Sequence, residues 1–419
     1  MKKTTIYYGW WIVLASSLTG FYVAGTIFYG FTAFVDPLVM EFGWSYTQIS
    51  FASSLRGLEM GIFAPIVGIF VDRLGSRIMI RLGMIVMGAS LILLAFTHSL
   101  VMFYAAFLLL ALGAGGCTSV VVMAVVANWF DKKVGLAMGI AICGFGAAGL
   151  LVPIVVKLIE LFQWRTTYII LGIGAWGIGI PMSFIIRNKP EDYGYLPDGE
   201  PLPEVQSETD ASAQEEDISF RKALKNRFFL SLLSIEAIRM LIVGTLVIHV
   251  MPYLNSLGIP RSTAGLVAAG IPICSMIGRF GFGWLGDILD KRYILSMTFI
   301  LTSAGLFIFS YLDRYWLIPV FLLLFGPGYG GGMTMRGSIL REYFGRVSFG
   351  KLIGLTMGIA SIAGIIGPTL GGWVFDTFGS YHYLWISFAC LSMVGIIIVL
   401  RLPSTRHRTR NSPSLRTLR

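Results

Sequence analysis

Long runs of apolar residues, separated by short polar segments, dominate the sequence. Residues 100–126, 168–186 and 383–400 contain no charged side chain, and each is about as long as the 20 residues that a helix needs to cross a hydrocarbon core. The apolar residues do not alternate with polar ones at period two, as they would in the strands of a membrane barrel. Because backbone groups in lipid must bond internally, the pattern predicts an all-α integral membrane protein.

The apolar runs, taken in order, predict twelve transmembrane helices. They are expected at residues 9–33, 48–71, 78–97, 100–127, 134–158, 167–186, 229–254, 263–286, 293–312, 315–339, 351–375 and 382–401. The segment between the sixth and seventh runs is rich in proline and acidic residues, so it is too polar to cross a bilayer and is expected to be partly disordered. The predicted organisation is an N-terminal six-helix bundle (1–186), a cytoplasmic linker (187–227), a C-terminal six-helix bundle (228–402) and a basic cytoplasmic tail (403–419).

The distribution of basic residues predicts the orientation in the membrane. Charged residues make up only 13% of the chain, yet the net charge is +10. With the N-terminus inside, the Lys and Arg residues of the loops fall almost entirely on the cytoplasmic side, as the positive-inside rule requires. The exceptions are Lys157, Arg165, Arg261 and Arg314. We therefore expect a multi-pass protein of the cell membrane with both termini in the cytoplasm, and we attribute the positive charge to topology rather than to nucleic-acid binding.

Three motifs recur in the same order in the two halves of the chain. GIFVDRLGSR (68–77) matches GWLGDILDKR (283–292), which relates Asp72 to Asp287 by an offset of 215 in the numbering; GAGG (113–116) matches GYGG (328–331) at the same offset. GLAMGIA (135–141) matches GLTMGIA (354–360) at an offset of 219. A repeat of six plus six helices predicts two bundles related by a pseudo-twofold axis along the membrane normal, with substrate bound between them near the midplane.

The first of these motifs resembles the loop signature of the major facilitator superfamily. The matching residues are Gly68, Asp72, Arg73, Gly75 and Arg77. In that superfamily the aspartate caps or pairs with neighbouring helix ends and stabilises the outward-open state, so the resemblance implies a gating role for Asp72, Arg73 and Arg77. It implies the same role for Asp287 in the second copy, where Ile288 replaces the first arginine.

A second resemblance concerns the start of the fifth predicted helix. WFDKKVGLAMGIA (129–141) is similar to the signature of the monocarboxylate transporters, and YGWW (8–11) matches part of their first-helix signature. The resemblance assigns Lys132 and Lys133 to the gating region. It implies a secondary transporter of monocarboxylates such as lactate or pyruvate with proton symport, or an antiporter of the related oxalate/formate branch.

Arg279 is the main candidate for substrate binding. It lies eight residues before Asp287, about 12 Å in from the predicted cytoplasmic end at 1.5 Å per residue. Its glycine neighbours Gly278, Gly281 and Gly283 are expected to leave room around a guanidinium that binds a carboxylate in a bidentate manner. The monocarboxylate transporters also carry an arginine in this helix, but where they usually have a proton-carrying aspartate one turn earlier, this chain has Ser275.

Other ionisable residues inside the predicted spans are candidates for proton coupling, because such residues are costly in lipid. The candidates are Glu59, Glu236 and His249. Arg56 and Arg239 lie three residues from Glu59 and Glu236 respectively, so each glutamate has a partner on the same helix face, which also permits a purely structural interpretation. His249 is expected near the outer mouth, where it either takes up protons or is simply interfacial.

The remaining polar residues of the spans are interpreted by their position along the helices. We expect Arg336, near the end of the tenth helix, to extend toward water or to gate rather than to bind substrate. Hydroxyl-bearing side chains of the first, fourth and tenth helices are expected either to line the substrate cavity or to pack between helices. They are Tyr22, Thr26, Tyr29, Thr118, Ser119 and Tyr329.

No feature of the sequence indicates an enzyme. It has no phosphate-binding loop and no Cys/His ligand set for a metal, and its four cysteines lie inside apolar runs, so we expect no cofactor and no disulfide. A drug or metabolite exporter of the same superfamily and a non-transporting nutrient sensor are the alternatives, the first disfavoured by Arg279 and the second by the short loops and tail. We expect a monomer whose partners are a small organic acid, protons and the lipid bilayer.

Overall fold

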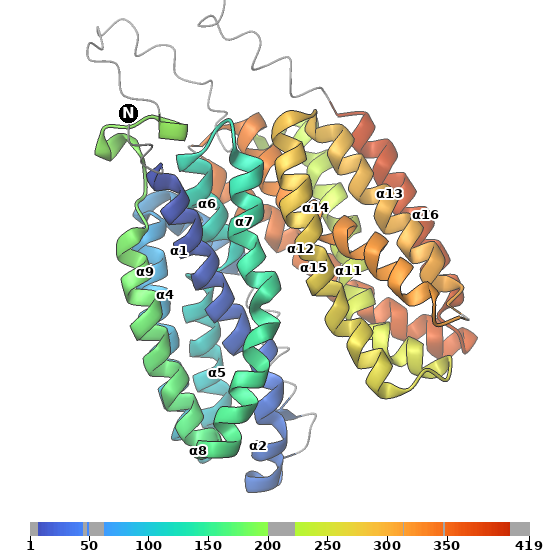
Figure 1. Ribbon diagram of the computed structural model, residues 1–419, viewed down its shortest axis with the longest axis horizontal. Coiled ribbons are helices and arrows are strands. Elements are labelled where there is room, and N and C mark those ends of the chain that lie inside the picture. Colours follow the sequence, from blue (N-terminus) through green and yellow to red (C-terminus); the bar gives the residue numbers. More distant parts are fainter. Residues whose placement is uncertain are drawn as a thin grey trace, which may run out of the picture. The chain divides into compact units, whose positions relative to one another are not determined.

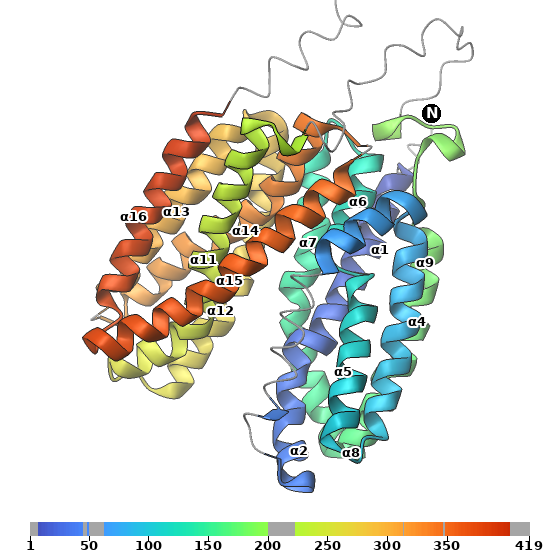
Figure 2. The same ribbon diagram turned by 180° about the vertical axis from the view of Figure 1, so that it is seen from behind.

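The computed structural model describes residues 7–44, 48–49, 63–199, 223–312, 314–346 and 348–402, and these residues form a helical protein (Figures 1 and 2). Ten described helical stretches are long and apolar enough to cross a membrane. One of them, Val134–Ile185, contains two predicted spans, which meet at the non-helical residue Gln163. Of the second predicted span, the structure describes residues 48–49 and then a helix from residue 63 to residue 74. The described helices therefore fit the twelve-span pattern.

The helices of the first half are interrupted by short irregular turns. They are α1 (Tyr8–Val23), η1 (Ala24–Tyr29), η2 (Gly30–Phe34), α2 (Val35–Phe42), α4 (Ser76–Ala95), α5 (Leu100–Gly115), α6 (Ser119–Trp129), α7 (Val134–Ala147), η3 (Ala148–Leu151), α8 (Val152–Gly174), η4 (Ala175–Gly179) and α9 (Ile180–Ile185). The predicted linker begins with two short turns, η5 (Glu191–Tyr193) and η6 (Pro197–Gly199). Segments η1 and η4 are π-helices. This form is rare overall, but where it occurs it is often found at a functional site.

The helices of the second half are longer and more regular. They are α11 (Arg227–Ser256), α12 (Arg261–Ile288), α13 (Lys291–Ser310), α14 (Leu317–Phe344), α15 (Phe349–Phe378) and α16 (His382–Leu400). In this half α14 packs against both α12 and α13, and α13 also packs against α16. Prolines inside α11, α12, α14 and α15 are tolerated because neighbouring helices can satisfy the freed backbone groups.

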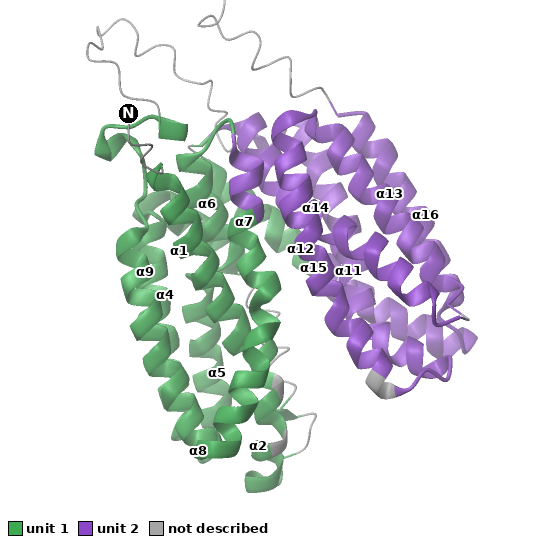
Figure 3. Ribbon diagram, viewed as in Figure 1, with its two compact units in different colours: residues 1–132, 140–217, 346–361 green, residues 133–139, 218–345, 362–419 purple. Residues whose placement is uncertain are grey.

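The chain forms two compact units (Figure 3). Unit 1 consists of residues 1–132, 140–217 and 346–361, and unit 2 of residues 133–139, 218–345 and 362–419. The first turns of α7 therefore belong to unit 2, and the first turns of α15 belong to unit 1.

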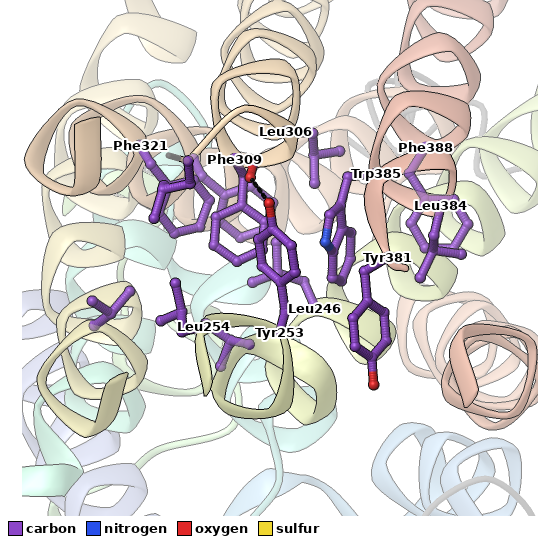
Figure 4. Close-up of a cluster of buried hydrophobic side chains, with 14 of the residues drawn as sticks. Leu246, Tyr253, Leu254, Leu306, Phe309, Phe321, Tyr381, Leu384, Trp385 and Phe388 are labelled. Atoms are coloured by element: carbon purple, nitrogen blue, oxygen red, sulfur yellow. Dashed lines mark hydrogen bonds between the residues drawn. The ribbon is translucent and has the colours of Figure 1, made fainter. Parts of the chain in front are cut away.

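An aromatic cluster fills the core of unit 2 (Figure 4). Tyr253 of α11 points to α13 and donates a hydrogen bond to the carbonyl of Phe309 at 2.6 Å. The ring of Phe309 stacks on Phe321 and meets Trp385 edge-on. Such rings contribute large contact areas, and the buried hydroxyl has the partner that it needs.

Glycines bring α12 and α14 into close contact. A Cβ added at Gly278 would lie 2.0 Å from the carbonyl oxygen of Pro327, and one added at Gly330 would lie 1.9 Å from that of Ser275. Helices in a membrane gain stability from such close packing, because lipid gives no hydrophobic drive for association. The prediction that Gly278 makes room for the Arg279 guanidinium is therefore wrong: Gly278 forms a helix contact.

Gly278→Ala is expected to destabilise the protein, because the new methyl group would meet backbone that cannot turn away. Overpacking of this kind costs about 1–3 kcal/mol. The matched control is Gly281→Ala on the same helix, where an added Cβ meets nothing within 4 Å. Thermal unfolding of the purified variants should give a lower Tm for Gly278→Ala only, and equal Tm values would contradict the packing described here.

Candidate functional site

Three charged side chains from two helices of unit 2 form a buried triad, Arg239–Glu236–Arg336. On α11, Arg239 donates from Nε to Oε2 of Glu236 at 3.0 Å and from Nη2 to Oε1 of the same carboxylate. Arg336 of α14 donates from Nη1 to Glu236 Oε1 at 2.5 Å. Each of the three residues is at most 5% exposed. The predicted local pair of Glu236 and Arg239 is thus confirmed, and a third member joins it.

The prediction that Arg336 extends toward water is wrong. The side chain lies two turns before the end of α14 and is 5% exposed. A carboxylate on the neighbouring helix offers a partner inside the protein, so the guanidinium pairs there. No local pattern in the sequence signals this contact, since Arg336 and Glu236 are 100 residues apart.

Arg279 lies on α12 of the same unit and is 3% exposed. Its Nη2 lies 3.6 Å from the sulfur of Met333, and its Cζ lies 5.9 Å from the centre of the Tyr329 ring, which is a cation–π distance. Tyr329 and Met333 are partly exposed. The predicted site residues Arg279 and Tyr329 are therefore brought together.

The space for the arginines comes from glycines of α14. A Cβ at Gly330 would lie 3.1 Å from Cγ of Arg279, and a Cβ at Gly332 would lie 2.9 Å from Cδ of Arg239. In the sequence, this glycine-rich stretch (328–332) stands out only as part of the repeat. Its specific role, which is to seat two guanidinium side chains against one helix, depends on how α11, α12 and α14 are rotated.

The candidate proton carriers differ in their surroundings. Ser275 is fully buried and donates to the carbonyl of Pro272 at 2.6 Å. His249 Nε2 lies 2.9 Å from the carbonyl of Pro368 and Nδ1 lies 3.1 Å from the hydroxyl of Tyr381. A carbonyl can only accept, so Nε2 carries a proton.

The two glutamates named as proton carriers are not equivalent. Glu236 is held between two guanidinium groups, from which it accepts three hydrogen bonds. Glu59, like Arg56, lies outside the described residues. The predicted pairing of Glu59 with Arg56 therefore stays a prediction.

Three of the predicted cavity residues of unit 1 donate hydrogen bonds to backbone carbonyls, Tyr22 across to α8 and the two threonines within a turn of their own position. Tyr22 donates to the carbonyl of Leu171 at 2.5 Å, Thr26 donates to that of Tyr22 at 2.8 Å, and Thr118 donates to that of Gly115 at 3.2 Å. Two further residues, Tyr29 at the end of η1 and Ser119 at the start of α6, are partly exposed. Substrate contact remains a prediction for all of them.

Asp72 and Asp287 each cap the first turn of a helix. In unit 1, the Asp72 carboxylate accepts from the backbone N–H groups of Gly350 and Lys351 at 2.9 and 3.0 Å. In unit 2, Asp287 accepts from those of Gly135 and Leu136 at 2.7 and 2.8 Å. Helix N-termini present unsatisfied donors and partial positive charge, so a carboxylate is well placed there.

These contacts correct the register of the repeat. Gly135 and Gly350 occupy the same place in the two caps, and they are related by the same offset as the two aspartates. One turn further on, a Cβ at Gly139 would meet the carbonyl of Arg279 at 2.3 Å, and one at Gly354 would meet that of Ala64 at 2.5 Å. The offset of 219 predicted from the similar heptapeptides is therefore wrong, since structurally equivalent residues keep the offset of 215.

The other predicted gating residues surround the two caps. Arg73 is exposed. The backbone N–H of Arg77 donates to Asn188 Oδ1 at 3.0 Å, and the Arg77 guanidinium lies 5.7 Å from the centre of the Phe184 ring. The exposed Lys132 and Lys133 lie in the turn before α7. The backbone N–H of Lys132 donates to the carboxylate of Asp198 at 2.6 Å.

Comparison with known proteins supports the transporter interpretation. A family model described as Major Facilitator Superfamily matches residues 10–281 and 240–418. The uncharacterized MFS-type transporter YcxA of Bacillus subtilis is 26% identical over 89% of this chain and 89% of its own length. Monocarboxylate transporter 12-B of Danio rerio is also 26% identical, over 89% of this chain and 83% of its own.

The solved structures give the same fold. The proton:xylose symporter XylE superposes with a TM-score of 0.75 over 95% of this chain and 96% of its own, at 12% identity. At that identity the likeness concerns the fold alone. The predicted all-α membrane class and the predicted major facilitator fold are therefore both confirmed.

Glu236→Gln is expected to destabilise unit 2 far more than Arg336→Gln. Loss of the carboxylate leaves two buried guanidinium groups without a counter-charge, which typically costs about 3–5 kcal/mol. Loss of Arg336 instead leaves the Glu236–Arg239 pair intact and neutral. Thermal unfolding of the two purified variants measures the difference, and an equal fall in Tm would show that the triad is not held together by charge.

Asp72→Asn is expected to change the pH dependence of stability. Asp72 lies just past the second predicted span, and burial raises the pKa of its carboxyl to about 6, although the Gly350 and Lys351 backbone N–H groups lower it. A raised pKa means that the folded protein binds this proton more readily than the unfolded chain. The part of the stability that depends on this proton is therefore present at low pH and lost as pH rises through about 6.

The measurement for this prediction is Tm at pH 5 and at pH 7.5. Lowering the pH should favour the wild type over Asp72→Asn, since the variant cannot take up the proton. Asp131→Asn, at an exposed aspartate, is the control. An identical pH response of wild type and Asp72→Asn would contradict the burial of this carboxyl.

Proposed function

The chain belongs to the major facilitator superfamily, and on that premise we propose that it is a secondary active transporter of small organic anions that works by alternating access. Monocarboxylates such as lactate and pyruvate, carried together with protons, are the first candidates. One of the relatives is named as a monocarboxylate transporter, and the segment 129–141 resembles the signature of that family.

The observation that carries the proposal is the buried guanidinium of Arg279. This group places a permanent positive charge among the packed helices of unit 2. It lies beside Tyr329 and Met333, which are both partly exposed. The planar fork of an arginine matches the two oxygens of a carboxylate, and a small acid suits a site with one aromatic wall. The same charge would repel the lipophilic cations that a drug exporter often carries.

Exchange of anions, as in the oxalate/formate branch, is the second candidate. It is favoured by Ser275, which stands where the proton-carrying acid is expected and whose hydroxyl already donates to Pro272. With proton symport, Glu59 and His249 are the first candidates as carriers and Glu236 the next, because Glu236 is already engaged by two arginines.

The paired caps supply the conformational part of the proposal. Asp72 and Asp287 would hold the first turns of α15 and α7 in one state and release them in another. Each release would separate segments that now belong to one compact unit. We further propose that the protein acts as a monomer in the cell membrane with both termini in the cytoplasm.

Arg279→Lys is expected to fold normally and to lose uptake. A lysine keeps the charge but cannot form two parallel hydrogen bonds to a carboxylate, a difference worth about tenfold to a hundredfold in binding. The measurement is uptake of radiolabelled L-lactate into proteoliposomes, with and without an inward proton gradient. Arg314→Lys, at an exposed arginine, is the matched control.

Gradient-stimulated uptake by wild type and its loss in Arg279→Lys would support proton-coupled monocarboxylate transport. Uptake that ignores the proton gradient but requires an internal anion would support exchange. Wild-type uptake that Arg279→Lys leaves unchanged would refute the anchoring role, and no uptake of any small acid would refute the substrate class.

A further inference from the structure

The buried charges of the Arg239–Glu236–Arg336 triad do not balance. Arg239 and Arg336 contribute two positive charges and Glu236 contributes one negative charge, and each of the three residues is at most 5% exposed. Both guanidinium groups are joined by hydrogen bonds to the one carboxylate. The triad therefore carries one positive charge in excess.

The triad also has hydrogen-bond donors to spare. Glu236 accepts three hydrogen bonds, two from Arg239 and one from Arg336. In the described structure, Nη1 of Arg239 and both Nε and Nη2 of Arg336 are buried and have no hydrogen-bond partner. Buried N–H groups that carry positive charge are costly to leave unpaired, so this cluster is built to take an additional acceptor.

The fold does not require a charge at this place. The offset that relates the fourth and tenth helices makes Val121 the equivalent of Arg336 in the first half. Val121 is fully buried. An apolar residue therefore serves packing at the equivalent position, and replacement of buried ion clusters by apolar residues is often neutral or stabilising. A purely structural role gives no reason for Arg336.

The triad adjoins the proposed carboxylate site. The Tyr329 ring meets Arg279 at a cation–π distance, and Tyr329 lies on α14 about two turns before Arg336, on the same face of that helix. Arg279 and Arg239 also pack against Gly330 and Gly332 of one helix, α14. One partly exposed tyrosine thus connects the single arginine with the triad.

We infer that the Arg239–Glu236–Arg336 triad is a second anion-binding site, which takes one further negative charge able to accept N–H hydrogen bonds. Two sources can supply that charge. One is the second carboxylate of a dicarboxylate substrate whose first carboxylate binds Arg279, and this source rests on the proposed function. The other is a free chloride ion, which does not rest on it.

The test compares wild type with Arg336→Gln, which removes the excess charge and keeps the Glu236–Arg239 pair. Tm of the purified proteins is measured in sodium isethionate at constant ionic strength, with lactate, malonate, succinate or chloride added. Inhibition of labelled lactate uptake by malonate and succinate is measured in parallel. Arg314→Gln, at an exposed arginine, controls for the loss of one charge from the protein.

If a dicarboxylate substrate supplies the further negative charge, malonate or succinate should stabilise wild type more than lactate does. The preference for the dicarboxylate over lactate then falls about tenfold or more in Arg336→Gln, which is the loss expected for hydrogen bonds to a charged group. For the free-ion source, chloride raises the Tm of wild type and not of Arg336→Gln, and the dicarboxylates show no advantage. Either result supports the second site.

The inference is overturned if wild type shows neither a dicarboxylate advantage nor a chloride effect, or if Arg336→Gln keeps whichever effect wild type shows. Should Arg336→Gln fail to fold, Arg336→Leu, an apolar residue like Val121 at the equivalent position, also removes the charge and is interpreted in the same way. If no carboxylate binds at all, the proposed function fails, while a chloride effect that depends on Arg336 still supports the second site.

Discussion

Two aspartates, Asp72 and Asp287, each accept hydrogen bonds from consecutive backbone N–H groups at the first turn of a helix. Those N–H groups have no partner within their own helix, and the helix dipole makes them favour an anion. The Asp287 cap also fixes the position of the first turns of α7. It brings Gly135 against Gly283 and, one turn later, Gly139 against the carbonyl of Arg279. The position of the candidate anion site on α12 therefore depends on this cap.

The repeat supplies the same scaffold twice, but the arginines of α12 and α14 have no counterpart at the equivalent positions of the first half. At the common offset between the halves, Ala64 and Val121 occupy the places of Arg279 and Arg336. In the described structure, the guanidinium groups buried inside the membrane helices thus gather in unit 2. Because each buried charge is costly, this concentration of arginines is the reason to look for anion recognition in the second half of the chain.

Glycine provides the room for this arrangement. Gly278 and Gly330 let α12 and α14 approach closely, and Gly330 and Gly332 leave space beside α14 for the side chains of Arg279 and Arg239. Close helix contact and room for two arginine side chains are thus produced by one short stretch of α14. Tyr329, within that stretch, contributes the aromatic ring that meets Arg279.

The membrane class, the helical spans, the repeat and the pairing of Glu236 with Arg239 could all be predicted from the amino-acid sequence. Each of these follows from hydropathy or from local spacing, since lipid excludes unpaired backbone groups and residues three apart share a helix face.

Three features emerged only from the packing of the helices: Arg336 completes the triad, Gly278 and Gly283 serve helix contacts, and the repeat keeps one offset throughout. These contacts join residues far apart in the chain, and they depend on the rotation and depth of each helix against its neighbours. Hydropathy does not encode these quantities, because any apolar helix of the right length satisfies the bilayer equally well.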